Sequence, residues 1–132
     1  MFGETTAYSS FSVDDLDAAR RFYGDQLGLT VEDSGTGDMR MLFLTLPGGA
    51  RVFVYPKENH TPASFTVLNF EVDDIDRAVD DLVARGATFE RYPEFEADDK
   101  GVVRPGEGDG GPAGIAWFTD PAGNVIAVMQ AR

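Results

Sequence analysis

The sequence predicts an α+β fold of two consecutive βαβββ modules, which form a curved mixed sheet around a concave cleft with the helices on the outer face. The first observation is a repeat: the nine residues from Phe11 recur from Phe70, with six identities at a constant offset of 59 residues. The second is the spacing of apolar residues. After each copy of the repeat, this spacing is first typical of a helix and then alternates, as is typical of strands. Such a repeat within 132 residues indicates a duplicated supersecondary unit.

The composition limits the class of protein. With 42% hydrophobic and 11% aromatic residues, the chain can bury a core, so disorder is not expected. The chain has no long apolar run and no basic, apolar leader, which predicts no membrane partner and a cytoplasmic location. Without cysteine, disulfides and thiolate metal sites are excluded. A net charge of −12 disfavours a nucleic-acid partner, and it either keeps the protein soluble or attracts a cationic ligand.

The first module covers about residues 1–57. Alternation from Tyr8 to Val13 predicts a strand, and Asp14 is expected to cap the helix that follows. Gly28 is expected to end this helix. A short strand over residues 29–33, a turn over 34–38 and a hairpin of 39–46 with 51–55 complete the module. The helix is predicted from apolar residues at helical spacing, namely Leu16, Ala19, Phe22, Tyr23 and Leu27.

The second module covers about residues 64–132 and follows a linker of about 58–63 that contains the only histidine, His60. A lone histidine in a linker is expected to be a solvated side chain. The predicted elements are a strand over 65–72, a helix over 74–85, a strand over 88–91, a long loop over about 93–114 and strands over 115–119 and 124–130. Because one helix covers one face of a sheet, the opposite face of each module is expected to line the cleft.

Groups that resemble catalytic motifs have simpler explanations. The carboxylate pairs Asp14/Asp15 and Asp73/Asp74 stand at helix starts, where capping is the expected role. One linker histidine does not build a Ser/His/Asp set, and no cysteine nucleophile exists. The run Gly106–Gly111 is acidic and lacks the lysine of a phosphate-binding loop. It is expected to be a flexible loop, or alternatively a lid over the cleft.

The whole pattern resembles the vicinal oxygen chelate superfamily, which includes glyoxalase I, extradiol dioxygenases, fosfomycin-resistance enzymes and bleomycin-resistance proteins. The resemblance covers nearly the whole chain, and it implies paired βαβββ modules around a concave site and favours a homodimer. It does not imply a reaction, because the superfamily hosts many. The residues that carry it are Val13-Asp-Asp-Leu-Asp17, Phe22-Tyr23, Leu27-Gly28-Leu29, Val72-Asp-Asp-Ile-Asp76, Gly86 and Asp120-Pro-Ala-Gly-Asn124.

The resemblance also implies where a metal would be bound, because metal-dependent members carry His or Glu ligands on four strands. Counting from the matched motifs places these ligand positions at Tyr8, Phe53, Val67 and Ala127. None of these side chains is an ordinary ligand of a divalent metal. A shift by one residue, to Ser9, Val54, Leu68 and Val128, does not supply a ligand set either. The sequence therefore predicts neither a metal nor another cofactor.

The cleft-facing positions suggest a different function. Together they form an aromatic surface with a few polar groups, as is typical of a small-molecule site. The alternative is that these rings only fill a core. The first functional hypothesis is a protein that binds a small aromatic or cationic molecule and is not an enzyme. The second is a glyoxalase- or dioxygenase-type enzyme with an atypical metal site or metal-free acid–base catalysis by Glu71 or Tyr8. The predicted ligand-binding residues are Tyr8, Phe43, Phe53, Tyr55, Asn69, Glu71 and Trp117.

Overall fold

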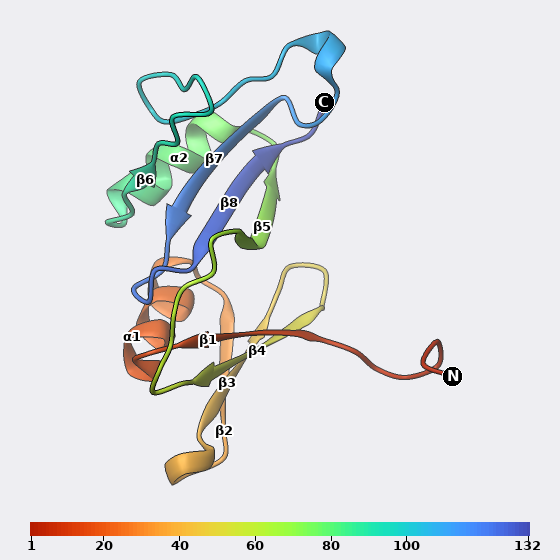
Figure 1. Cartoon of the computed structure of the whole chain (residues 1–132), viewed down its shortest axis with the longest axis vertical. Helices are drawn as coiled ribbons and strands as arrows, with labels where there is room; N and C mark the ends of the chain where they lie inside the picture. The colour runs from red at the N-terminus through yellow and green to blue at the C-terminus, as the bar shows by residue number, and fades with distance from the viewer. The chain divides into compact units, whose positions relative to one another are not determined.

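The computed structural model describes all residues, 1–132, and confirms the α+β class, with two four-stranded mixed sheets. The chain divides into two compact units, Met1–Thr61 and Pro62–Arg132. Each unit follows the βαβββ order that the repeat predicts (Figure 1). Neither helix has the length and apolar content needed to cross a bilayer.

The sheet of the first unit has the strand order β1-β4-β3-β2, in which β1 runs parallel to β4 and the other pairs are antiparallel. Alternate residues of these strands are buried on the face that carries the helix, as the predicted alternation requires. The strands are β1 (Ser9–Val13), β2 (Thr30–Ser34), β3 (Met41–Thr45) and β4 (Arg51–Pro56). The buried strand residues are Phe11, Val13, Leu42, Leu44, Val52 and Val54.

Helix α1 (Leu16–Arg20) begins one residue later than the sequence predicts. The cap is Asp15, whose carboxylate accepts a hydrogen bond from the Ala18 backbone N–H at 3.1 Å, so the expectation for Asp14 is wrong. An N-cap side chain bonds the N–H two or three residues ahead, and Asp15 has that spacing and an extended backbone. Asp74 caps α2 (Ile75–Ala84) in the same way, through the Arg77 N–H at 3.1 Å.

The first helix continues as a π-helical segment (Arg21–Gln26), which the spacing does not predict. The Leu27 N–H donates to the Phe22 carbonyl at 2.9 Å, five residues back. The repeat explains this widening: the capping aspartates are 59 residues apart, but the terminal glycines Gly28 and Gly86 are 58 apart. The first helix therefore has one extra residue, and a π turn accommodates one residue more than an α turn.

The sheet of the second unit has the matching order β5-β8-β7-β6, again with one parallel pair, β5 with β8. Helix α2 packs against β7 and β8 on one face, burying Ile75 and Val79 (Figure 1). Every strand lies within a residue or two of its predicted range. The strands are β5 (Thr66–Val72), β6 (Phe89–Glu90), β7 (Gly114–Thr119) and β8 (Val125–Gln130).

The long loop between β6 and β7 is attached to the second sheet by backbone hydrogen bonds. The Val103 N–H donates to the Ile115 carbonyl at 2.8 Å, and the Ile115 N–H donates to the Val103 carbonyl at 2.9 Å. Val102 is buried, and the Asp98 carboxylate accepts from the Val102 N–H at 2.9 Å. The first part of the loop is therefore fixed beside β7, which decides where its aromatic side chains lie.

Candidate functional site

The helix-free face of the first sheet carries a row of four aromatic rings, which we call the first-unit ring row: Tyr8, Phe43, Phe53 and Tyr55. The alternation of β3 and β4 places Phe43, Phe53 and Tyr55 opposite the buried core residues, and Tyr8 lies directly before β1. Ring centroids are 5.4 Å apart for Tyr8–Phe43, 5.4 Å for Phe43–Phe53 and 5.5 Å for Phe53–Tyr55. Four of the seven predicted ligand-binding residues thus form one continuous aromatic surface.

A pocket of about 230 Å³ lies at the end of this row. Its lining combines two of the four rings with flexible methionine side chains, which adapt readily to an apolar ligand. Met39 is 68% exposed, so part of the lining is open to solvent. The lining residues are Asp38, Met39, Arg40, Met41, Phe53, Tyr55 and Pro56.

The basic side chains near the ring row are paired with carboxylates. Arg40 lies 2.8 Å from Asp17 and 3.2 Å from Asp33, and the hydrogen bonds that its guanidinium donates to these carboxylates raise the pKa of Arg40. The Arg51 guanidinium lies 4.0 Å from the centre of the Phe43 ring and 3.8 Å from Glu32. One side of Phe43 is thus already covered by a cation, whereas Phe53 and Tyr55 face the pocket.

A polar pair stands beside the row, where sequence reasoning expected only a solvated histidine. Ser12 Oγ and His60 Nδ1 are 2.7 Å apart, and both residues are half-buried. Ser12 is in register with Tyr55 in the β1–β4 ladder, so the pair adjoins the ring row. The expectation for His60 is wrong because the Lys57 N–H bonds the Val13 carbonyl at 2.9 Å, which holds the start of the linker against the end of β1.

In the second unit, the three remaining predicted residues share the helix-free face of the sheet. Asn69 is in register with Ala127, and Ala127 with Trp117, so the three residues form one transverse row. Glu71 is in register with Met129, two residues further along β5 and β8, on the same face. Asn69 and Glu71 are both exposed.

Trp117 belongs to an aromatic cluster that sequence reasoning missed. Its ring centroid lies 5.3 Å from Tyr92, edge to face, and 5.3 Å from Phe95, stacked. With Phe65 these rings line a pocket of about 180 Å³, which we call the tryptophan pocket. The signal that the sequence offers is the pair Tyr92 and Phe95, two aromatic residues at the start of a long loop that is otherwise rich in acids and glycines. The lining residues are Ser64, Phe65, Thr66, Tyr92, Glu94, Phe95, Trp117 and Val125.

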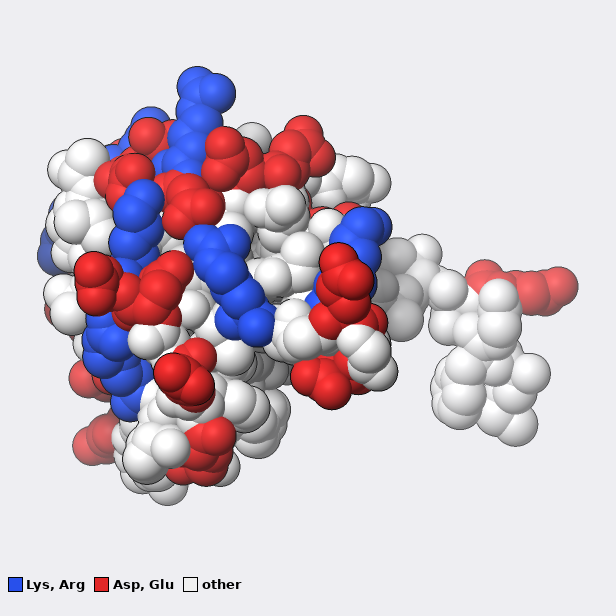
Figure 2. Space-filling model, turned by 90° about the horizontal axis from the view of Figure 1, so that it is seen from above, with Lys and Arg blue, Asp and Glu red and all other residues white.

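Two basic side chains of the second unit pair with carboxylates. Lys100 Nζ lies 3.0 Å from Asp80, and Arg104 lies 2.8 Å from Asp76. In Figure 2, basic and acidic side chains lie next to one another over the displayed face. Burial by itself would raise the pKa of Asp98, but hydrogen bonds from the backbone N–H groups of Val102 and Lys100, with nearby Arg104, lower it overall.

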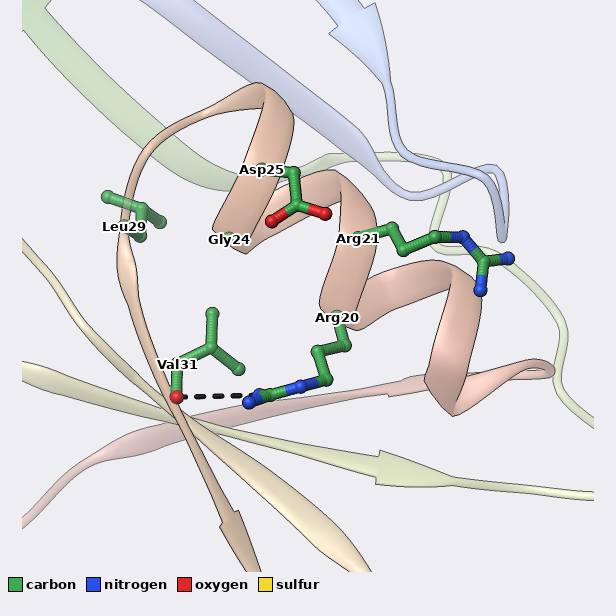
Figure 3. A pocket seen from close by; sticks show the side chains of 6 residues that line it. All are labelled: Arg20, Arg21, Gly24, Asp25, Leu29 and Val31. Carbon is green, nitrogen blue, oxygen red and sulfur yellow. Dashed lines mark hydrogen bonds between the residues drawn. The ribbon is translucent and has the colours of Figure 1, made fainter.

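A further hollow, of about 310 Å³, lies beside the π-helical segment and outside the aromatic faces. Figure 3 shows Arg20 reaching across it towards the Val31 carbonyl, a hydrogen bond of 3.4 Å, while Arg21 points away. Arg20 also pairs with Asp33 at 3.2 Å, so it joins the helix to β2. This hollow therefore has a structural explanation in the contact between helix and strand.

The family model for the glyoxalase/bleomycin resistance protein/dioxygenase superfamily matches residues 6–128. The chain belongs to this superfamily. One similar solved structure is TnmS3, an antibiotic binding protein from Streptomyces sp. CB03234, with 22% identity over 98% of both chains and a TM-score of 0.68. Another is a superfamily member from Sphaerobacter thermophilus DSM 20745, with 24% identity over 96% of this chain and 98% of that chain and a TM-score of 0.65. No curated protein matches the sequence.

The superfamily raises the question of a metal, and the residues present do not fit one. The positions that the resemblance assigns to metal ligands hold a phenol, a phenyl, an isopropyl and a methyl group, at Tyr8, Phe53, Val67 and Ala127. No three His, Cys, Asp or Glu side chains of the structure are grouped so that they could hold a metal ion. Divalent transition metals need imidazole, carboxylate or thiolate donors, so these positions cannot form the usual site.

Proposed function

We propose that the protein binds a small planar aromatic molecule on the first-unit ring row, without a metal and without catalysing a reaction. The row itself carries the proposal: four rings stand within 5.4–5.5 Å of their neighbours beside a pocket of about 230 Å³. Three of the rings are half-buried and Tyr8 is exposed, and accessible rings of this kind favour stacking with a flat ligand. The antibiotic-binding function of TnmS3 supports small-molecule binding in a chain of this fold.

The polar groups near the row suggest how such a ligand is oriented. Ser12 and His60 stand beside Tyr55, and a hydroxyl and an imidazole can together offer a donor and an acceptor. A planar ligand that carries one hydroxyl or carbonyl group would stack on Phe53 and Tyr55 and direct that group towards the pair. The net charge of −12 supports the absence of a nucleic-acid partner. A homodimer and a cytoplasmic location stay predictions of the sequence.

Calorimetric titration with 2-naphthol, a neutral bicyclic probe, tests this function. We expect saturable binding that EDTA does not change, and Phe53→Ala should weaken it about tenfold, because a stacking wall is lost. Phe2→Ala is the matched control, since Phe2 is 78% exposed and outside the row. Binding that requires a stoichiometric metal, or that Phe53→Ala leaves unchanged, would contradict the proposal.

A further inference from the structure

The tryptophan pocket has a composition that differs from the ring row of the first unit. Its rings come from three segments: Phe65 precedes β5, Tyr92 and Phe95 follow β6, and Trp117 lies in β7. Glu94 is the only charged residue of the lining, which contains no basic side chain. The volume of about 180 Å³ is below the range of about 300–1,000 Å³ for drug-sized sites, and it favours a ligand the size of a headgroup.

The surroundings of the pocket make it electronegative. Glu90 is paired with Trp117 in the β6–β7 ladder, and Glu94 lies in the lining. Burial raises the pKa of the Tyr92 phenol, and the negative charges of Glu90 and Glu94 raise it further. Arg91, the basic residue of this stretch, donates instead to the backbone carbonyls of Asp98 and Asp99, at 2.8 Å each.

We propose that the tryptophan pocket binds a small organic cation, specifically a quaternary ammonium group. The faces of tryptophan and tyrosine rings carry partial negative charge and attract such cations. A quaternary ammonium group has no N–H, so aromatic walls satisfy it without hydrogen-bond acceptors, and one carboxylate supplies the opposite charge. This site lies within the second unit and does not depend on the function proposed for the ring row.

The test uses the fluorescence of Trp117, the only tryptophan of the chain. The full-length protein is titrated with choline and, separately, with 3,3-dimethyl-1-butanol, a neutral molecule of nearly the same shape. We expect choline to change the emission saturably and to bind about tenfold more tightly than the alcohol, because only choline gains the cation–π attraction. No saturable change with choline, or equal affinity for both compounds, overturns the proposal.

Two variants locate the effect. Glu94→Gln should weaken choline binding about threefold or more, and Tyr92→Leu should weaken it about fivefold, since each removes one attractive group. Glu107→Gln removes the same charge outside the pocket and should leave choline affinity unchanged. Circular dichroism verifies that each variant is folded. Equal choline affinity in Glu94→Gln and Glu107→Gln would contradict a site at this pocket. The function proposed for the ring row is tested separately, by 2-naphthol binding to Phe53→Ala.

Discussion

The two units build the same sheet from the same order of elements, yet they surround their aromatic rings with different charges. In the first unit, the arginines beside the ring row are paired, Arg40 with Asp17 and Asp33 and Arg51 with Glu32. In the second unit, Glu94 stands in the tryptophan pocket without a basic side chain in the lining. Duplication thus preserved the scaffold while the charges around the two aromatic surfaces diverged, and this difference supports the two proposals, a neutral ring on one surface and a cation on the other.

The β3–β4 hairpin of the first unit and the β7–β8 hairpin of the second also differ, in how their turns are held. The β3–β4 turn is made by Pro47-Gly48-Gly49, and both glycines have positive φ angles, 93° and 96°. The β7–β8 turn instead depends on Asp120, which is 3% exposed. Its carboxylate accepts hydrogen bonds from the backbone N–H groups of Ala122 and Asn124, both at 2.9 Å, and from Asn124 Nδ2 at 3.0 Å. Both turns use glycine at positive φ, since Gly123 in the second turn has a φ of 85°, but only the second turn is also held by a buried carboxylate.

The largest effect is expected when this carboxylate is removed. Asp120→Ala leaves buried N–H groups without an acceptor and should lower the free energy of unfolding by about 3 kcal/mol. Urea denaturation followed by circular dichroism measures the loss. Asp81→Ala, on the exposed side of α2, is the control, and its free energy of unfolding should stay within about 0.5 kcal/mol of that of the native protein. A loss below about 1 kcal/mol for Asp120→Ala would mean that the second hairpin does not depend on its carboxylate.

The next largest effect concerns the difference between the two aromatic surfaces. Phe53→Ala should weaken 2-naphthol binding about tenfold and leave choline binding unchanged, because a neutral ring needs stacking rather than charge. Tyr92→Leu should weaken choline binding about fivefold and leave 2-naphthol binding unchanged. Both ligands are titrated into both variants by calorimetry. If either variant weakens both ligands equally, the two surfaces act as one site and the comparison fails.

The helix caps provide a test of what the units share. Asp15→Ala and Asp74→Ala remove equivalent caps, and each should lower the free energy of unfolding by about 1 kcal/mol. Urea denaturation of both variants measures the two losses side by side. Asp14→Ala and Asp73→Ala are the matched controls one residue earlier, and they should have little effect. A greater loss for Asp14→Ala than for Asp15→Ala would favour the cap that the sequence predicted.

The smallest effect is the pH dependence of the loop that carries Phe95. The folded protein holds the pKa of Asp98 below its ordinary value of 3.8. The charged carboxylate therefore stabilises the fold above pH 3.8, and this contribution is lost as the pH falls through the lower folded-state pKa. The stability difference between the native protein and Asp98→Asn, measured in urea at pH 6 and at pH 3, should be smaller at pH 3. A difference that does not shrink would show that the Asp98 charge does not hold the loop.

The sequence by itself determined the element order, because the repeat and the apolar spacing are local patterns that strand and helix geometry must satisfy. It also determined which strand residues share a face, which is why Tyr8, Phe43, Phe53 and Tyr55 were expected on one surface. The position of the helix cap and the π turn were missed. The π turn follows from a residue count, since the stretch from Asp15 to Gly28 is one residue longer than that from Asp74 to Gly86, but apolar spacing alone does not show it. Asp14 and Asp15 are adjacent and can both cap a helix, so only the backbone geometry and the bond from the Ala18 N–H distinguish them.

Only the tertiary structure decided which loop residues join the aromatic surfaces. Tyr92 and Phe95 reach Trp117 because the following loop bonds β7 through Val103, a contact between residues distant in the sequence. His60 reaches Ser12 because the linker continues along the end of β1. Strand periodicity fixes the direction of side chains within a strand, but a loop has no such period, and long-range hydrogen bonds set its path.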